Sequence, residues 1–183
     1  MCCVRNFGGR HNSCPNSPSF RRFALRLTEE LAEHYKDQKN IAAWHVSNEY
    51  GGACYCENCE KAFRVWLKRK YKTLDKLNHE WNTHFWGKTY YSWDDIVVPN
   101  LLSEHFEEKR SQNQGLTLDY MRFNSDSMLE NFKAERDAIK ARIPGALVTT
   151  NMMGFYKQLD YKKWAGEMDF VSWDNYPNNE DPG

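Results

Sequence analysis

Segments typical of strands and of amphipathic helices alternate along this chain, and a parallel α/β fold is the arrangement that such an order favours. Apolar runs of strand type occupy residues 41–47, 146–151 and 169–177. Helical periodicity occupies residues 19–38, 58–72, 73–86, 116–143 and 159–168. Because two parallel neighbouring strands need a long crossover, usually a helix, the alternation predicts a parallel sheet or barrel.

Polar residues stand where each predicted strand ends: Asn48-Glu49, Asn151, and Trp173-Asp174. The carboxyl ends of parallel strands meet at one edge, where α/β enzymes carry their sites. We therefore expect these residues at one active face, as in a (β/α)8 TIM barrel, with a doubly wound sheet as the alternative. The sequence contains no Gly-rich phosphate turn of the G-x-G-x-x-G or G-x-x-x-x-G-K type, which disfavours nucleotide-binding folds.

Individual residues predict where these helices begin and which side chains are buried. In the first helix an apolar face carries Phe20, Ala24, Leu27, Leu31 and Tyr35, and Ser19 is the expected N-cap. Thr73 is the expected cap of the third helix. His45, within the first strand, is expected to be a hydrogen-bonded core histidine. Residues 5–19 and 87–115 are expected to be loops, the second with a solvated charged run, SEHFEEKR.

Charge and composition exclude several classes of protein. Lys plus Arg and Asp plus Glu both count 25, which argues against a basic nucleic-acid surface and a polybasic membrane anchor. No apolar run approaches the roughly 18 residues of a membrane span. The start, MCCVRNFGGR, lacks the apolar region of a signal peptide, so we expect a cytoplasmic protein. Aromatic residues make up 15%, which suits sugar binding, although core packing is their commoner use.

Glu49 is the candidate catalytic residue. A carboxyl group at the end of an apolar strand is partly withdrawn from water, as suits a general acid. Glycosidases need such an acid to protonate the departing oxygen, together with a second carboxylate. The preceding Asn48 can donate a hydrogen bond to a sugar hydroxyl.

Three cysteines, Cys54, Cys56 and Cys59, follow this glutamate within ten residues. Close spacing without an export signal favours metal ligation over disulfides. A structural zinc site takes four ligands, so a fourth is needed from elsewhere. Cys14 is the best candidate and His11 a weaker one, whereas Cys2 and Cys3 stay unassigned. A closed four-cysteine site leaves no position for water, so the zinc would brace loops around 10–19 and 50–60 and would not catalyse.

Four longer stretches occur in a recognisable order: FGGRHNSCPNSPSFRRF, WHVSNEYGGACYCENCEKAFRVWLKRKY, LNHEWNTHFWGKTYYSWDDIVVP and DFVSWDNYP. In this order and with these spacings they resemble glycoside hydrolase family 42, the β-galactosidases, and the resemblance extends from Phe7 onward. It implies a (β/α)8 barrel with further domains, often assembled as a homotrimer. It also implies hydrolysis of terminal non-reducing β-D-galactosyl residues of β-galactosides or galacto-oligosaccharides, with retention of configuration.

Residue by residue, the resemblance implies Glu49 as general acid/base, with Arg10 and Asn48 binding the galactosyl ring. It implies a structural zinc held by four cysteines: Cys14, Cys54, Cys56 and Cys59.

The family's nucleophilic glutamate follows the seventh barrel strand. Residues 1–183 resemble one partial barrel domain, from about the third βα loop to the sixth strand. Glu167 precedes its strand, and Asp174 is not the residue the family uses. We therefore expect the nucleophile C-terminal to this chain, and an inactive fragment whose open strand edges limit its solubility.

Two other functions compete with the enzyme. One is a zinc-braced remnant that binds carbohydrate without cleaving it. The other is a zinc-ribbon-like nucleic-acid module, which the zero net charge disfavours.

Overall fold

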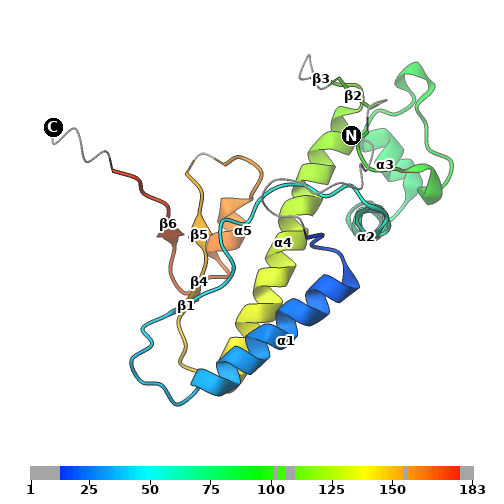
Figure 1. The fold of residues 1–183 in the computed structure, drawn as a ribbon. Helices are drawn as coiled ribbons and strands as arrows, with labels where there is room; N and C mark the ends of the chain where they lie inside the picture. Colours follow the sequence, from blue (N-terminus) through cyan, green and yellow to red (C-terminus); the bar gives the residue numbers. More distant parts are fainter. Residues whose placement is uncertain (1–12, 101–102, 106–109, 155, 178–183) are drawn as a thin grey trace. The chain divides into compact units, whose positions relative to one another are not determined.

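The computed structural model describes residues 13–100, 103–105, 110–154 and 156–177 (Figure 1). The predicted substrate-binding residue Arg10, the alternative metal ligand His11, and the unassigned Cys2 and Cys3 lie outside these residues. The chain divides into two compact units. Unit 1 comprises residues 1–21 and 52–127, and unit 2 comprises residues 22–51 and 128–183. The division falls within the two long helices, α1 (Pro18–Tyr35) and α4 (Gln114–Arg142).

Unit 1 is mainly helical. Helix α2 (Glu57–Tyr71) and the short helix α3 (Leu74–Glu80) pack with the N-terminal half of α4, and two 3-10 turns follow, η1 (Phe85–Gly87) and η2 (Trp93–Asp95). The strands β2 (Glu104–His105) and β3 (Arg110–Ser111) form a minimal antiparallel pair. The core is rich in aromatic and aliphatic side chains: Phe63, Leu67, Leu77, Trp81, Ile96, Leu116, Tyr120 and Phe123.

A buried carboxylate ties the helices of unit 1 together. Asp119 on α4 is 1% exposed and accepts hydrogen bonds from Tyr71 Oη (2.5 Å), Trp81 Nε1 (3.1 Å) and Arg122 (2.9 Å), and it also contacts Lys70 Nζ. Burial alone would raise the pKa of Asp119, but the bonds from Lys70, Tyr71 and Arg122 outweigh it and lower that pKa. The ionised carboxylate is therefore the form that holds α2, α3 and α4 in contact.

Unit 2 contains the parallel strands. Its short strands are β1 (Trp44–His45), β4 (Val148–Thr149), β5 (Asn151–Met152) and β6 (Ser172–Trp173), with helix α5 (Tyr161–Ala165) between the last two. β1 pairs with β4 in register Trp44↔Val148, and β5 pairs with β6 in register Asn151↔Ser172, both in parallel.

The backbone carbonyls show that residues 147–152 lie between the other two strands. The carbonyls of Leu147 and Thr149 accept from Trp44 N and Val46 N of the β1 segment. The carbonyls of Val148 and Met152 accept from Asp169 N and Asp174 N, which flank β6. Since successive carbonyls in a strand point to opposite edges, the order is β1, then β4 with β5, then β6.

The core of unit 2 lies between these strands and the helices that cover them. Val148, Phe132 and Trp164 are each 0% exposed, and α1 contributes Ala32. This arrangement leaves the C-terminal ends of three neighbouring parallel strands at one edge, as the sequence predicts.

The predicted order of the main helices and parallel strands is confirmed, and so is the cap at Thr73, whose side chain accepts from Lys76 N. The expected loop 87–115 is partly wrong, because it contains η2 and the paired strands β2 and β3, and the expected helix 73–86 ends at Glu80. The predicted cap Ser19 is wrong: α1 begins at Pro18, and Ser17 Oγ accepts from Phe20 N at 3.3 Å. The core position of His45 is also wrong, because its side chain is exposed, although it is hydrogen-bonded.

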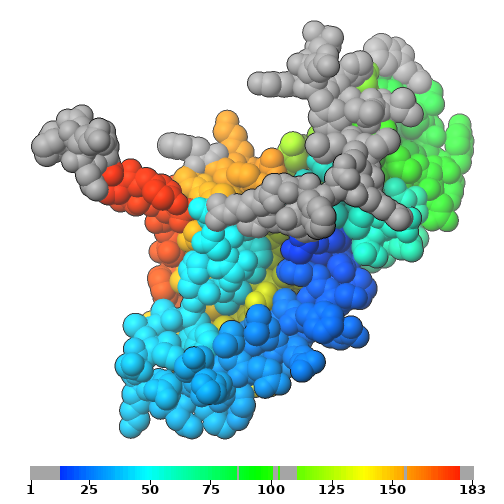
Figure 2. Space-filling view, in the orientation of Figure 1, coloured from blue at the N-terminus to red at the C-terminus, as the bar shows by residue number. Residues whose placement is uncertain are grey.

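The predicted apolar face of α1 is only partly covered. Leu27 is 62% exposed, and Leu31 and Tyr35 are about two-fifths exposed, whereas Thr28 and Ala32 are buried. Figure 2 shows much of the α1 surface uncovered on the visible face.

The described strands do not close into a barrel, so the described part of the molecule is an open set of short parallel strands with helices. No helix among the described residues is long and apolar enough to cross a membrane.

Candidate active site and metal centre

Glu49 lies just beyond β1, at the C-terminal edge of the three strands, and is partly buried. Its backbone has φ +48°, and Ser47 has φ +58°. Positive φ is uncommon for residues other than glycine, and such strained positions cluster at functional sites. The side chain of Asn48, between them, is exposed.

The backbone of Glu49 is held by the next strand. Its N–H donates to Asn151 Oδ1 at 2.8 Å, and Asn151 Nδ2 donates to Asp174 Oδ1 at 2.7 Å. His45 Nε2 lies 3.0 Å from Asn151 Oδ1 and 3.1 Å from Asn151 N. The three strand ends that the sequence predicts to meet are therefore joined through one amide side chain.

The residue after the glutamate anchors the same segment in the core. The ring of Tyr50 packs against Trp164, with centroids 5.0 Å apart, and edge-on against Phe132 at 6.4 Å. Burial raises the pKa of Tyr50 above its usual range. At Gly51 an added Cβ would lie 2.9 Å from Met153 Cε and 3.2 Å from Tyr156 Oη, so these side chains would have to shift to admit a larger residue.

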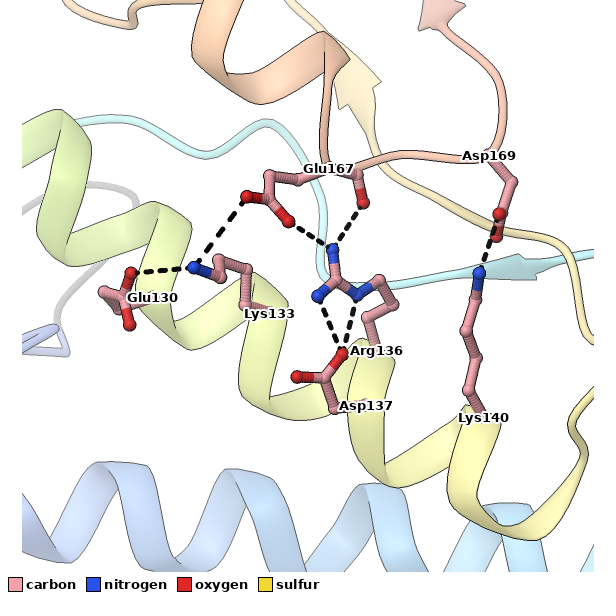
Figure 3. Close-up of polar contacts among 7 residues, drawn as sticks. All are labelled: Glu130, Lys133, Arg136, Asp137, Lys140, Glu167 and Asp169. Atoms are coloured by element: carbon pink, nitrogen blue, oxygen red, sulfur yellow. Dashed lines mark hydrogen bonds and ion pairs between the residues drawn. The ribbon is translucent and has the colours of Figure 1, made fainter.

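The other two carboxylates considered in the sequence are both bound by other side chains. Glu167 precedes β6 and is paired with Arg136 on α4, with Nη1 2.6 Å from Oε2, as Figure 3 shows. The Arg136 hydrogen bond lowers the pKa of Glu167. Lys140 separately binds Asp169 at 2.7 Å, so two sets of ion pairs fasten α4 to the segment before β6. Asp174 accepts from Asn151, as described above.

The second site is a cluster of four cysteines within unit 1. The sulfurs of Cys14, Cys54, Cys56 and Cys59 all lie within 4.8 Å of one another, and Cys14 Sγ is 3.4 Å from both Cys56 Sγ and Cys59 Sγ. None of the four is in a disulfide. Tetrahedral zinc with Zn–S bonds of about 2.3 Å places its sulfurs ~3.8 Å apart. The cluster therefore fits a four-coordinate metal. The positions of the four sulfurs confirm the prediction that Cys14 lies with the other three cysteines.

Helix α2 begins at this cluster. Cys56 is the N-cap of α2, and Cys59 lies in its first turn. Asn16 Nδ2 donates to Cys59 Sγ at 3.4 Å. This hydrogen bond from Asn16 was not predicted from the sequence, although Asn16 stands in the same CPNS stretch as Cys14.

The thiols also affect one another's ionisation. Hydrogen bonds from Cys14 and Cys59 lower the pKa of Cys54 to about 2, while the bond with Cys54 raises the pKa of Cys14 to about 12. The bond with Cys14 likewise raises the pKa of Cys59. A bound divalent metal would stabilise the thiolate form of its cysteine ligands.

The fold defines the class, which is that of α/β proteins with parallel strands, and the polar side chains of Asn151 and Asp174 meet the backbone of Glu49 at the C-terminal strand ends. A family model for the β-galactosidases of glycoside hydrolase family 42 matches residues 3–183, and the chain belongs to this family.

Individual relatives agree with this assignment. The chain is 58% identical over 178 residues to β-galactosidase BgaP of Planococcus sp. (strain L4), covering 97% of this chain and 26% of the relative. It is 50% identical to β-galactosidase LacZ of Lactobacillus acidophilus, covering 96% and 27%. The crystal structure of β-galactosidase from Bacillus circulans sp. alkalophilus aligns with a TM-score of 0.90 at 62% identity, covering 97% and 26%. The chain thus spans about a quarter of the length of these relatives.

Proposed function

We propose that residues 1–183 form part of the TIM-barrel catalytic domain of a retaining β-galactosidase, which hydrolyses terminal non-reducing β-D-galactosyl residues of β-galactosides or galacto-oligosaccharides. The observation that carries this proposal is Glu49 at the end of β1, with its N–H bound to the neighbouring strand end at 2.8 Å. Membership of the β-galactosidase family supports the substrate class.

In the proposed mechanism Glu49 acts first as an acid and then as a base. Its carboxyl group gives a proton to the glycosidic oxygen as the bond to the galactosyl carbon breaks, and a second carboxylate attacks that carbon. Glu49 then takes a proton from the water that releases galactose. Asn48 and Arg10 are proposed to bind the galactosyl ring.

The nucleophile is proposed to come from a part of the protein C-terminal to this chain. Retaining glycosidases hold their two carboxyl groups about 5–5.5 Å apart. Glu167 is unsuited to this role because it precedes β6 and is neutralised by Arg136. Asp174 is engaged with Asn151 instead.

The four cysteines are proposed to hold a structural zinc. Four thiolates complete a tetrahedron, so the metal would supply a cross-link between residues near 10–19 and 50–60 and no chemistry at the sugar. We further propose that the whole protein is a homotrimer, on the strength of the family resemblance, and that it is cytoplasmic, as expected from its sequence. Light scattering coupled to size exclusion would give the subunit number.

The Glu49→Gln variant of the whole protein tests the catalytic assignment. The kcat/KM for lactose, a substrate with a poor leaving group, should fall by about 10²–10⁴-fold. Activated aryl β-galactosides should lose much less, because their leaving groups need little protonation.

The matched control is Glu80→Gln, on the exposed surface of α3, which should leave both rates unchanged. Equal losses on lactose and aryl galactosides in Glu49→Gln would contradict the acid role.

A zinc-braced, non-catalytic carbohydrate-binding remnant is the second candidate function. It is favoured by one observation: the two further carboxylates considered, Glu167 and Asp174, are both engaged with other residues. This alternative would be established if calorimetry showed that the chain binds galactosides and enzyme assays showed that the whole protein does not cleave them.

A further inference from the structure

We infer that Asn151 is a positioning residue, which fixes the backbone of Glu49 by linking it to Asp174 across the ends of three neighbouring strands. The inference rests on the proposed role of Glu49 as acid/base. It starts from three contacts of one side chain: Glu49 N to Oδ1 at 2.8 Å, His45 Nε2 to Oδ1 at 3.0 Å, and Nδ2 to Asp174 Oδ1 at 2.7 Å.

The orientation of the Asn151 amide is determined by its neighbours. On one side stands a donor, the N–H of Glu49, and on the other an acceptor, the carboxylate of Asp174. Only the orientation with Oδ1 toward Glu49 satisfies both, because the flipped amide would face a donor with a donor and an acceptor with an acceptor. A side chain with one acceptor and one donor end is therefore required, and asparagine supplies both.

The backbone of Glu49 needs such a restraint. Residues 47 and 49 both have positive φ, which costs free energy and persists only where surrounding contacts impose it. Tyr50 is anchored in the core against Trp164 on the C-terminal side. The bond from Asn151 restrains the segment from the neighbouring strand, so Glu49 is held at a fixed place relative to β5.

His45 supports the same amide from the first strand. Its Nε2 lies within hydrogen-bond distance of both Asn151 Oδ1 and Asn151 N. A ring nitrogen that carries a proton can donate to Oδ1, and one that does not can accept from the backbone N–H. In either state His45 contacts Asn151, so the link spans β1, β5 and the end of β6.

The test exchanges the two ends of the link. Asn151→Asp keeps the acceptor for Glu49 N–H but places a carboxylate against Asp174, where like charges repel. When Asp174→Asn is added, the amide introduced at position 174 can donate to the carboxylate introduced at position 151. The hydrogen bond is thereby restored with its donor and acceptor exchanged. The two single variants, the double variant and Glu49→Gln are compared in the whole protein, with kcat/KM measured on lactose and on an activated aryl β-galactoside.

We expect Asn151→Asp to lose about 10- to 100-fold in kcat/KM on lactose, and much less on the aryl galactoside, because a displaced acid fails mainly where protonation is needed. The double variant should recover most of this loss. Val148→Ala, which removes buried apolar atoms from the same strand and touches no polar group of the link, should lower both rates alike or neither.

Hydrogen exchange provides a readout that does not depend on activity. The peptide containing Glu49 should exchange faster in Asn151→Asp and return toward the wild-type rate in the double variant, while the Val148→Ala control should leave it unchanged. Unchanged exchange in Asn151→Asp would overturn the inference.

The outcomes separate the inference from the proposed function. A selective loss in Glu49→Gln without a selective loss in Asn151→Asp, or without recovery in the double variant, overturns the inference and leaves the function standing. A loss in Glu49→Gln that is equal on both substrates overturns both.

Discussion

Residues of the same type occupy different environments in this chain. The carboxylates of Glu49 and Glu167 differ in what surrounds them: one stands at a strand end beside a strained backbone, and the other is bound by Arg136 on the flank of α4. Only the first is proposed as a proton donor, because of its place at the C-terminal end of a strand. Residue type alone therefore does not assign the role, and position relative to the strand does.

At the cysteine cluster the expected consequence of a single substitution is loss of metal. Cys56→Ser should lower the zinc content of the purified protein to well below one per chain, since a three-cysteine site binds zinc less tightly. The stability of the protein should fall with it, because binding of a structural metal contributes to the free energy of folding. Elemental analysis and a thermal melt with and without chelator measure the two effects.

The control for this substitution is Cys3→Ser, outside the proposed ligand set, which should keep full zinc content and an unchanged melt. Full occupancy in Cys56→Ser would show that the ligand set is wrong.

Asp119 gives a pH-dependent prediction. Its folded pKa is lowered, so the carboxylate contributes stability above the unfolded value near ~3.9 and loses it as pH falls through the folded pKa. Asp119→Asn should cost about 1–3 kcal/mol at pH 7, because donors around it lose their charged acceptor. In urea denaturation the difference from wild type should shrink as pH is lowered below ~4. A gap that is independent of pH would argue against an ionised Asp119.

At the scale of helices and strands, the contact of α1 with α4 is partly polar. Thr28 Oγ1 donates to Glu135 Oε2 at 3.0 Å, and burial raises the pKa of Glu135. A carboxyl group with a raised folded pKa destabilises the fold once pH rises above its unfolded pKa. The buried carboxylate of Glu135 therefore lowers the stability of the protein at neutral pH, although it accepts the hydrogen bond that joins the two helices.

The Glu135→Gln variant should be modestly more stable than wild type at pH 7 and equal to it near pH 4, because glutamine keeps an acceptor for Thr28 without the buried charge. Thermal melts at the two pH values measure this difference. The matched control is Glu130→Gln on the same helix, whose exposed carboxylate pairs with Lys133 at 3.2 Å and which should show no gain. A loss of stability at pH 7 in Glu135→Gln would contradict the prediction.

At the scale of the whole molecule, the described strands form an open set, and several apolar side chains near β6 stay exposed. Phe170, Val171 and Trp173 are 41%, 56% and 54% exposed, respectively. Open strand edges and exposed apolar side chains favour association between chains. The expectation from the sequence that the isolated chain is poorly soluble is consistent with these exposures.

The isolated 183-residue chain should not hydrolyse a chromogenic β-galactoside, because the proposed nucleophile belongs to another part of the protein. The whole protein, assayed in parallel, should do so. Measurable turnover by the purified chain, abolished in its Glu49→Gln variant, would show that the second carboxylate lies within these residues after all.

Much of the fold and site could be predicted from the sequence because the signals are local. Helical periodicity and a capping threonine predicted α2 and the start of α3, and the closely spaced cysteines predicted a cluster able to bind a metal. The cap of α1 was misplaced by two residues, because Ser17 and Ser19 are both competent caps and only the path of the chain through Pro18 selects one.

By itself the sequence determined the order of elements, the candidate acid Glu49 and the cysteines able to bind a metal, since these depend on residue type and spacing along the chain. Only the tertiary structure decided that Asn16 donates to Cys59 Sγ, and that Asn151 holds the amide of Glu49. Such contacts join residues far apart in the chain, and their geometry depends on how strands and helices pack, which no local pattern encodes.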